Sequence, residues 1–125
     1  MTEQALFDYI KETYLEDLEK TTHTYEYTDA TSTGYRLTLE LKCRHTHYDE
    51  LILEKDKYES LVGLAESLGF TPFYINSTPQ GIYAFNLRKI KVSWTTKRLP
   101  SNTVDKGPAV DKKVALLHID KAVKL

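Results

Sequence analysis

The chain has 125 residues, of which 41% are hydrophobic and 28% are charged, and its formal net charge at pH 7 is -1. This length and composition predict one compact folded domain and argue against a disordered chain or two domains of ordinary size. The near-neutral charge argues against binding of nucleic acid by bulk attraction, so any such contact must come from a local basic patch.

The first predicted element is an amphipathic helix over residues 3–20. Apolar side chains recur there at nearly helical spacing, and charged side chains lie between them. The apolar positions are Phe7, Ile10, Tyr14 and Leu18. The hydroxyl of Thr2 is placed to cap the first turn, although Ala5 stands where a capping box would have an acid.

A β-hairpin is predicted next. Residues 21–29 are rich in threonine and tyrosine, residues 30–34 have turn chemistry, and residues 35–45 alternate between apolar and polar. Because successive strand residues point to opposite faces, the second strand has one core face and one polar face. The core face carries Tyr35, Leu37, Leu39, Leu41 and Cys43. The polar face carries Arg36, Thr38, Glu40, Lys42 and Arg44.

A second helix is predicted over residues 54–68, with Gly69 as its C-terminal stop. Its apolar stripe consists of Tyr58, Leu61, Val62, Ala65 and Leu68. Residues 73–75 and 82–85 then predict two strands around turn residues 77–81.

The last part of the chain predicts an exposed loop followed by a strand. Residues 97–113 contain two prolines, a glycine and several basic side chains, and residues 114–119 are strand-like. We expect a single domain over residues 1–125, with a core at about 3–94 and a C-terminal loop and strand at 95–125. Four strands around one central helix, with another helix before them, favour an α/β or α+β sandwich.

The single cysteine, Cys43, excludes an internal disulfide and a zinc site of the multi-cysteine type. No apolar run is long enough to span a bilayer, and the N-terminus lacks the layout of a signal peptide. We therefore expect a cytoplasmic protein with no membrane partner.

Two carboxylates and an ammonium are predicted to converge on the hairpin. Asp29 lies where the first strand meets the turn, and Glu40 and Lys42 lie on the polar face of the second strand. Carboxylates on neighbouring strands suit a hard divalent ion such as Mg²⁺. Such an ion activates water and neutralises charge on a phosphate, while Lys42 orients the water or stabilises the transition state.

With these residues the sequence resembles the PD-(D/E)XK nuclease superfamily. Asp29 stands for the first acid, and Glu40-Leu41-Lys42 is the (D/E)XK tripeptide. Over residues 3–87 the order of helix, hairpin, helix and strand pair also fits the family, and residues 35–44, Tyr48-Asp49, Lys57-Tyr58 and 73–76 look like small bacteriophage members. The resemblance implies a restriction-endonuclease-like core, a mixed central sheet of four to five strands flanked by helices.

The resemblance also implies roles for particular residues. The backbone carbonyl of Leu41 would complete a metal shell with Asp29 and Glu40, and Glu3 would assist as the acid of the first helix. Lys55 and Tyr58 stand near the place of a glutamine-tyrosine motif found in some branches. The chain departs from the pattern in having Thr28, and no proline, before Asp29.

The sequence therefore predicts a Mg²⁺-dependent DNA endonuclease or exonuclease, with Mn²⁺ as a substitute ion and no small-molecule cofactor. It would be encoded by a phage or mobile element and act in the host cytoplasm. A homodimer is expected because cutting two strands needs two sites, with residues 114–119 as an edge strand or residues 82–85 as the interface. The expected nucleic-acid contacts are Arg36, Arg44, Lys55 and Tyr58, within a wider basic rim that includes Lys57, Arg88, Lys89 and Lys91.

Other interpretations stay open at this stage. A polar strand face is often simply solvated, and the fold would then serve as a catalytically inactive DNA-binding or protein-interaction module. His45 and His47 alternate at a strand end, where exposed histidines are commoner than metal ligands. Cys43 shares its face with leucines, which favours a buried apolar role over a nucleophile.

Overall fold

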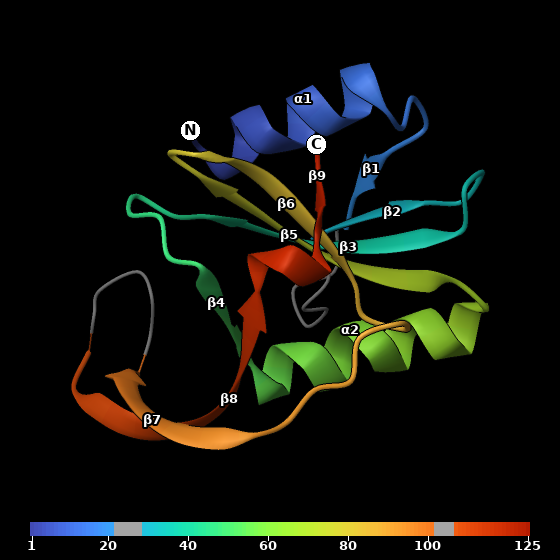
Figure 1. Ribbon diagram of the computed structural model, residues 1–125. Helices are drawn as coiled ribbons and strands as arrows, with labels where there is room; N and C mark the ends of the chain where they lie inside the picture. The colour runs from blue at the N-terminus through green and yellow to red at the C-terminus, as the bar shows by residue number, and fades with distance from the viewer. Residues whose placement is uncertain (22–28, 102–106) are drawn as a thin grey trace.

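Two sheets and two α-helices make up the part of the chain that the computed structural model describes, residues 1–21, 29–101 and 107–125 (Figure 1). The larger sheet is mixed and has the strand order β1-β2-β3-β5-β6-β9. Its strands are β1 (Glu19–Lys20), β2 (Ala30–Ser32), β3 (Leu37–Cys43), β5 (Thr71–Thr78), β6 (Gly81–Asn86) and β9 (Val123–Lys124). The smaller sheet has the order β4-β8-β7 and contains β4 (Glu50–Glu54), β8 (Ala109–His118) and β7 (Thr95–Pro100).

Helix α1 (Glu3–Thr13) covers one face of the larger sheet (Figure 1). The Thr2 hydroxyl accepts a hydrogen bond from the backbone N–H of Ala5 at 3.0 Å, so the predicted cap is confirmed. Its buried residues, Leu6, Phe7 and Ile10, pack in one core with leucines of β3. The helix is shorter than the predicted span 3–20, because the chain after Thr13 turns away and buries Leu15 and Leu18 without helical geometry.

The turn between β2 and β3 lies later than predicted. Residues 30–32 form a strand, with Ala30 opposite Leu39, and the turn occupies residues 33–36. Asp17 accounts for this shift, because its carboxylate accepts hydrogen bonds from the Ser32 hydroxyl at 2.5 Å and the Gly34 N–H at 2.6 Å. The expected strand over residues 21–29 falls mostly on residues 22–28, outside the described part of the chain.

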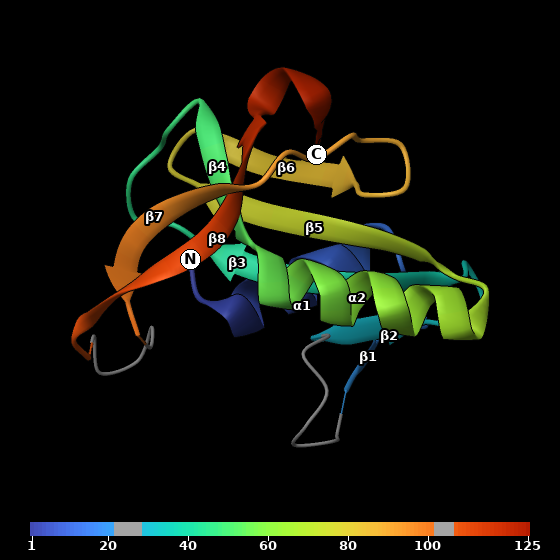
Figure 2. The same ribbon diagram turned by 90° about the horizontal axis from the view of Figure 1, so that it is seen from below.

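Helix α2 (Lys55–Leu68) covers the opposite face of the larger sheet and connects β4 to β5 (Figures 1 and 2). It ends as predicted at Gly69, whose φ of 70° lies in the left-handed region that glycine adopts without strain. Strand β5 then pairs in parallel with β3, with Glu40 opposite Tyr74. Strand β6 follows after a turn that is tighter than the predicted 77–81.

The polar face of β3 is not solvated. Thr38 and Glu40 are buried beneath α2. The leucines of β3 point to the other face of the sheet, where they pack in the core that contains α1. The second core lies on the α2 side of the sheet and includes Leu61 of α2, Leu53 of β4 and Phe85 of β6. Among the described residues, no helix is long and apolar enough to cross a membrane.

The smaller sheet corrects the expectation of a loop over residues 97–113. Strands β7 and β8 pair antiparallel from Thr95↔Val114 to Pro100↔Ala109, and β4, which had no predicted counterpart, pairs with β8. Polar and apolar residues do not alternate clearly along β7 and β8, because both faces of these strands carry mostly exposed side chains. Their pairing depends on partners distant in the sequence.

Both strands expected at a dimer interface are interior in the strand order of their sheets. Residues 114–119 largely belong to β8, the middle strand of the smaller sheet, and residues 82–85 belong to β6, which lies between β5 and β9. Strand β8 pairs with β4 over Val114–His118 but with β7 only as far as Val114, so residues 115–118 are paired on one side only. Strand β9 pairs with only Tyr83 and Ala84 of β6. The interface at residues 114–119 or 82–85 stays a prediction.

Arg44, which follows β3, connects the larger sheet to β4 through hydrogen bonds. Its guanidinium donates hydrogen bonds to the Asn76 amide oxygen at 2.9 Å, the Ile52 carbonyl at 2.7 Å and the Tyr74 hydroxyl at 2.9 Å. The Tyr74 hydroxyl donates in turn to the same Ile52 carbonyl at 2.8 Å. Arg44 is thus part of the framework, whereas the sequence predicted it only as a nucleic-acid contact.

Replacing Arg44 with alanine should lower the free energy of unfolding by about 2 kcal/mol, because buried acceptors on Asn76 and Ile52 lose a charged donor. Arg44→Lys should recover little, since an ammonium cannot reproduce the planar fork. Urea unfolding curves measure both, with the exposed Arg98→Ala as the control. An Arg44→Ala curve that overlays the wild-type curve would contradict this role.

Candidate active site

The three predicted site residues Asp29, Glu40 and Lys42 meet on β3 and the segment just before β2. The N–H of Asp29 donates to the Leu39 carbonyl at 3.0 Å, which aligns this segment beside β3. The Asp29 carboxylate then accepts a hydrogen bond from the N–H of Leu41 at 2.7 Å. This bond holds the first acid against the backbone of the Glu40-Leu41-Lys42 tripeptide.

Glu40 is a buried carboxylate whose side chain projects from β3 toward α2. Only 4% of the residue is exposed, and one carboxylate oxygen, Oε1, lies 3.5 Å from the Nζ of Lys57. The other oxygen, Oε2, has no hydrogen-bond partner among the described residues. Burial, and then repulsion from Asp29, raise the pKa of Glu40 to about 8.

Asp29 shares its surroundings with the acid of the first helix. Burial raises the pKa of Asp29, the Leu41 N–H opposes that shift, and the negative charge of Glu3 adds to it. Glu3, Asp29 and Leu41 line one cavity of about 260 Å³ between α1 and the sheet. The structure therefore brings Glu3, in the first turn of α1, to the mouth of the site.

Lys42 and Lys57 supply the positive charge on the other side of Glu40. Lys42 is half-buried, and its pKa is lowered by burial and by the cations Lys57 and Arg44. Burial lowers the pKa of Lys57, but its interactions with Glu40, Tyr74 and Glu54 together outweigh that effect, so the pKa is raised. The site thus pairs an unsatisfied carboxylate with two closely spaced cations.

Lys57 is the site residue that the sequence placed only in a general basic rim. Helical spacing could have identified Lys57, because it precedes the buried Leu61 and Ala65 by one and two turns on the same face of the helix. A lysine in line with core positions points toward the sheet. Its partner Glu40 could be identified only from the packing of α2 on β3.

The other expected nucleic-acid residues lie away from this centre. Arg36 is exposed in the 33–36 turn, at the opposite end of β3 from Lys42. Lys55 and Tyr58 both lie against Trp94, with the Lys55 Nζ 5.9 Å from the indole centroid. Their place in α2 turns them away from Glu40, while Lys57 faces it.

His47 is not the exposed strand-end histidine that the sequence predicted. Only 8% of its side chain is exposed, and its ring nitrogens contact the Thr78 hydroxyl at 2.9 Å and the Asp49 carboxylate at 3.2 Å. His45 is exposed, as expected. Cys43 packs at the edge of the α1 core, and burial raises the pKa of its thiol, which is consistent with an apolar role.

The donor set suits a hard divalent cation. Asp29 and Glu40 offer carboxylate oxygens on adjacent backbone segments, Leu41 offers its carbonyl between them, and the unpartnered Oε2 of Glu40 is a buried acceptor that a cation would satisfy. Within residues 1–21, 29–101 and 107–125, no three His, Cys, Asp or Glu side chains gather closely enough to hold an ion by themselves. Such a site suits Mg²⁺, which keeps several waters.

Comparison with solved structures identifies the fold. The chain matches Hjc, a Holliday junction resolvase from the archaeal hyperthermophile Archaeoglobus fulgidus, with a TM-score of 0.59 and 18% identity over 94% of this chain and 96% of that one. No family model and no curated protein matches the sequence. The likeness confirms the predicted fold class, a mixed α+β, restriction-endonuclease-like fold. The larger sheet exceeds the predicted four to five strands, because the described residues add the short β1 and β9.

The raised pKa of Glu40 predicts how the metal-free protein responds to pH. Native Glu40 holds its proton up to about pH 8, whereas the unfolded chain releases it near its ordinary value of 4.5. The native state therefore binds more protons between these values, and stability falls as pH rises through that window. Each unit by which the pKa is raised corresponds to about 1.4 kcal/mol.

Urea unfolding in EDTA at pH 5 and pH 8 measures this loss. Glu40→Gln should remove most of it, while Glu59→Gln, which changes an exposed carboxylate of α2, should leave it unchanged. An equal pH dependence in wild type and Glu40→Gln would show that the Glu40 carboxyl titrates as it does in the unfolded chain.

Proposed function

We propose that the protein is a metal-dependent nuclease that hydrolyses phosphodiester bonds in DNA, with Mg²⁺ as the ion and Mn²⁺ as a substitute. The observation that carries this proposal is the buried Glu40, which has an unpartnered oxygen and lies beside Asp29 and Lys42 on a fold shared with a DNA resolvase. Burying a carboxylate in this way costs stability, and such costly groups are typical of functional sites.

Asp29, Glu40 and the carbonyl of Leu41 would hold the ion, and Glu3 would assist through water. The chemistry that a bound divalent ion supplies is Lewis acidity toward the scissile phosphate and the attacking water. Positive charge at this point would also lower the pKa of Glu40 and favour its ionised form. Because Glu40 must release its proton to hold the ion, binding of the ion would become more favourable as pH rises.

The two lysines would have different tasks. Lys42 lies on the same tripeptide as Glu40 and, with a pKa lowered by burial, can orient the attacking water or exchange a proton with it. Its positive charge would stabilise the developing charge on the phosphate. Lys57 contacts Glu40 and would act as a positioning residue that holds this carboxylate toward the ion.

Branched DNA is the substrate class to test first, because the structural neighbour is a Holliday junction resolvase. The local resemblance to small bacteriophage proteins supports a phage or mobile-element origin and action in the host cytoplasm. The second candidate function is a catalytically inactive DNA-binding or protein-interaction module. It is favoured by the lack of a three-ligand side-chain cluster within the described residues.

Glu40→Gln and Lys42→Met should abolish cleavage of four-way junction, single-stranded and duplex DNA in Mg²⁺ or Mn²⁺, because each removes a charge at the reacting centre. Asp29→Asn should do the same while keeping an oxygen for the Leu41 N–H. Lys55→Met is the control for Lys42→Met, since it also removes a lysine, one at the start of α2 that lies against Trp94. The nuclease proposal fails if wild-type protein cuts none of these substrates, or if Glu40→Gln cuts them equally well.

A homodimer is part of the proposal, because cleavage of two strands requires two centres. Residues 115–118 of β8 are paired only with β4, so this segment is open on its other side and stays a candidate for the dimer surface. Sedimentation velocity at micromolar concentration should show a species of twice the 14.4 kDa monomer mass. A single monomeric boundary over this range would remove the dimer from the proposal.

A further inference from the structure

Strands β7 and β8 form an arm beside the candidate active site, and one face of this arm turns toward β3 and α2. Lys97 and Lys112 are directly opposite each other in the β7–β8 register, so their side chains share one face. Leu99 of the same face, Pro100 and Lys112 line a cavity of about 120 Å³ together with Lys42 and Lys57. We call this the inner face of the arm.

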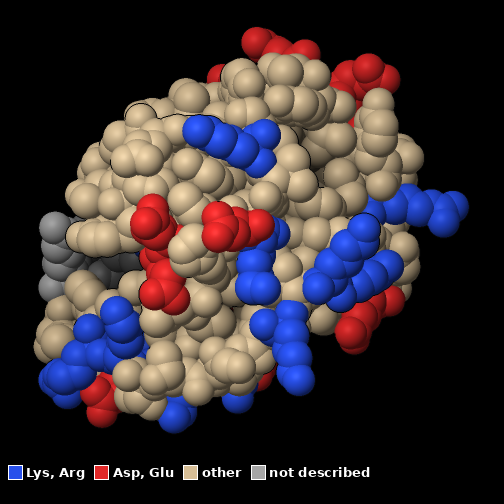
Figure 3. All heavy atoms as spheres, in the orientation of Figure 1, with Lys and Arg blue, Asp and Glu red and all other residues tan. Residues whose placement is uncertain are grey.

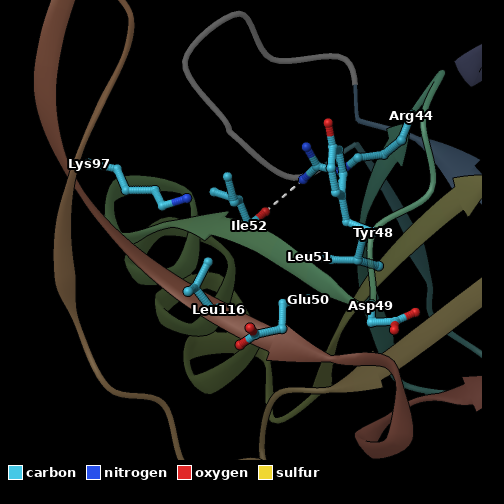
Figure 4. Close-up of a pocket in the computed structure, with 8 residues that line it drawn as sticks. All are labelled: Arg44, Tyr48, Asp49, Glu50, Leu51, Ile52, Lys97 and Leu116. Carbon is cyan, nitrogen blue, oxygen red and sulfur yellow. Dashed lines mark hydrogen bonds between the residues drawn. The ribbon is translucent and has the colours of Figure 1, made fainter.

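A larger hollow of about 570 Å³ lies next to this cavity and is lined by Lys97, Leu116 and Tyr48. The two hollows share Arg44 and Ile52 in their walls. Figure 4 shows the Lys97 side chain directed from the arm into the larger hollow, opposite Arg44 and Tyr48. We call these two adjoining hollows, which extend from Lys97 to Lys42, the groove.

The inner end of the groove is strongly cationic. Four cations line the smaller cavity, against the single carboxylate of Glu54. The cations are Lys42, Arg44, Lys57 and Lys112. Lys112 binds Glu54 at 2.8 Å, which leaves the cavity with a net positive charge. Two lysines directly opposite on paired strands destabilise a sheet, and an anion between them would relieve that repulsion.

The outer face of the arm is arranged differently. Arg98 lies 3.4 Å from Asp111, its direct partner across the strands, and Lys113 donates a hydrogen bond to the Thr96 hydroxyl at 2.7 Å. Its cations are thus matched by acceptors of the arm itself. In Figure 3 lysine and arginine side chains gather over the end of the molecule where β7 and β8 lie in Figure 1.

We propose that the inner face of the β7–β8 arm binds the phosphodiester backbone of the DNA strand that enters the active site, with Lys112 and Lys97 contacting successive phosphates. The inference rests on the proposed nuclease function, because it places the substrate strand in the groove that ends at Lys42. Leu99 and Pro100 provide an apolar wall for the sugars between these phosphates. The arm replaces Arg44, whose donors are held by the framework, as the main phosphate contact.

The test compares two double variants of equal charge by fluorescence anisotropy with a labelled four-way DNA junction. The inner-face variant is Lys97→Ala/Lys112→Ala, and the outer-face variant is Arg98→Ala/Lys113→Ala. Binding is measured in EDTA over a series of salt concentrations, so that cleavage cannot interfere. The inner-face variant should bind about tenfold more weakly and lose about 0.9 from the salt slope for each lysine removed, whereas the outer-face variant should bind nearly as wild type does.

Glu54→Gln separates phosphate binding from a merely structural role of the Lys112–Glu54 pair. It breaks the same ion pair but leaves Lys112 free, so DNA binding should be unchanged or tighter. A loss of binding equal to that of Lys112→Ala would overturn the proposal, because it would show that the ion pair and not the cation matters. Circular dichroism melting curves identify any variant whose fold is altered, and single variants then replace it.

The outcomes distinguish this inference from the proposed function. If wild type binds and cuts DNA and the two double variants lose affinity equally, the arm proposal is overturned while the nuclease stands. If wild type binds DNA without cutting it and only the inner-face variant loses affinity, the arm is supported as the DNA-binding surface. The proposed nuclease activity is then overturned. If wild type neither binds nor cuts DNA, both are overturned.

Discussion

The rest of the site depends on one constraint, the burial of the Glu40 carboxylate between β3 and α2. A charged carboxylate cannot remain in such surroundings without a counter-charge or a proton. Lys57 on α2 provides part of the compensation, and the raised pKa of Glu40 shows that the compensation is incomplete. The unpartnered oxygen of Glu40 is an acceptor that a cation would satisfy, so the same burial that destabilises the free protein would favour metal binding.

A second constraint places β3 next to the arm. Arg44 continues β3 and binds groups of β4 and β5 at once, so the end of the Glu40-Leu41-Lys42 tripeptide is fixed relative to the smaller sheet. Because β4 pairs with β8, and β8 with β7, this connection also positions the arm beside Lys42. The position of the groove between the arm and the site therefore depends on the hydrogen bonds of Arg44 and on the pairing of β4, β8 and β7.

Local patterns in the sequence were enough to predict the central part of the fold. The alternation in residues 37–43 identified β3 and put Glu40 and Lys42 on the same face, because the side-chain period of a strand is two. The helical stripe ending at Gly69 located α2 within one residue at its start. Asp29 was correctly placed beside the tripeptide although the turn was predicted too early, because its own hydrogen bonds align it with Leu39 and Leu41.

The sequence by itself thus determined the order of the core elements and the identity of the acidic pair and lysine, since these depend on periodicity and spacing within short segments. Only the tertiary structure decided that the polar face of β3 is buried, that Lys57 meets Glu40, and that residues 97–100 and 109–113 form strands. Each of these depends on a segment distant in the sequence: α2 packs over β3, and β8 pairs between β4 and β7. The position of the 33–36 turn likewise depends on the distant residue Asp17. Hydrogen bonds and burial between residues far apart in the chain leave no period in the sequence, so they become visible only when the chain is folded.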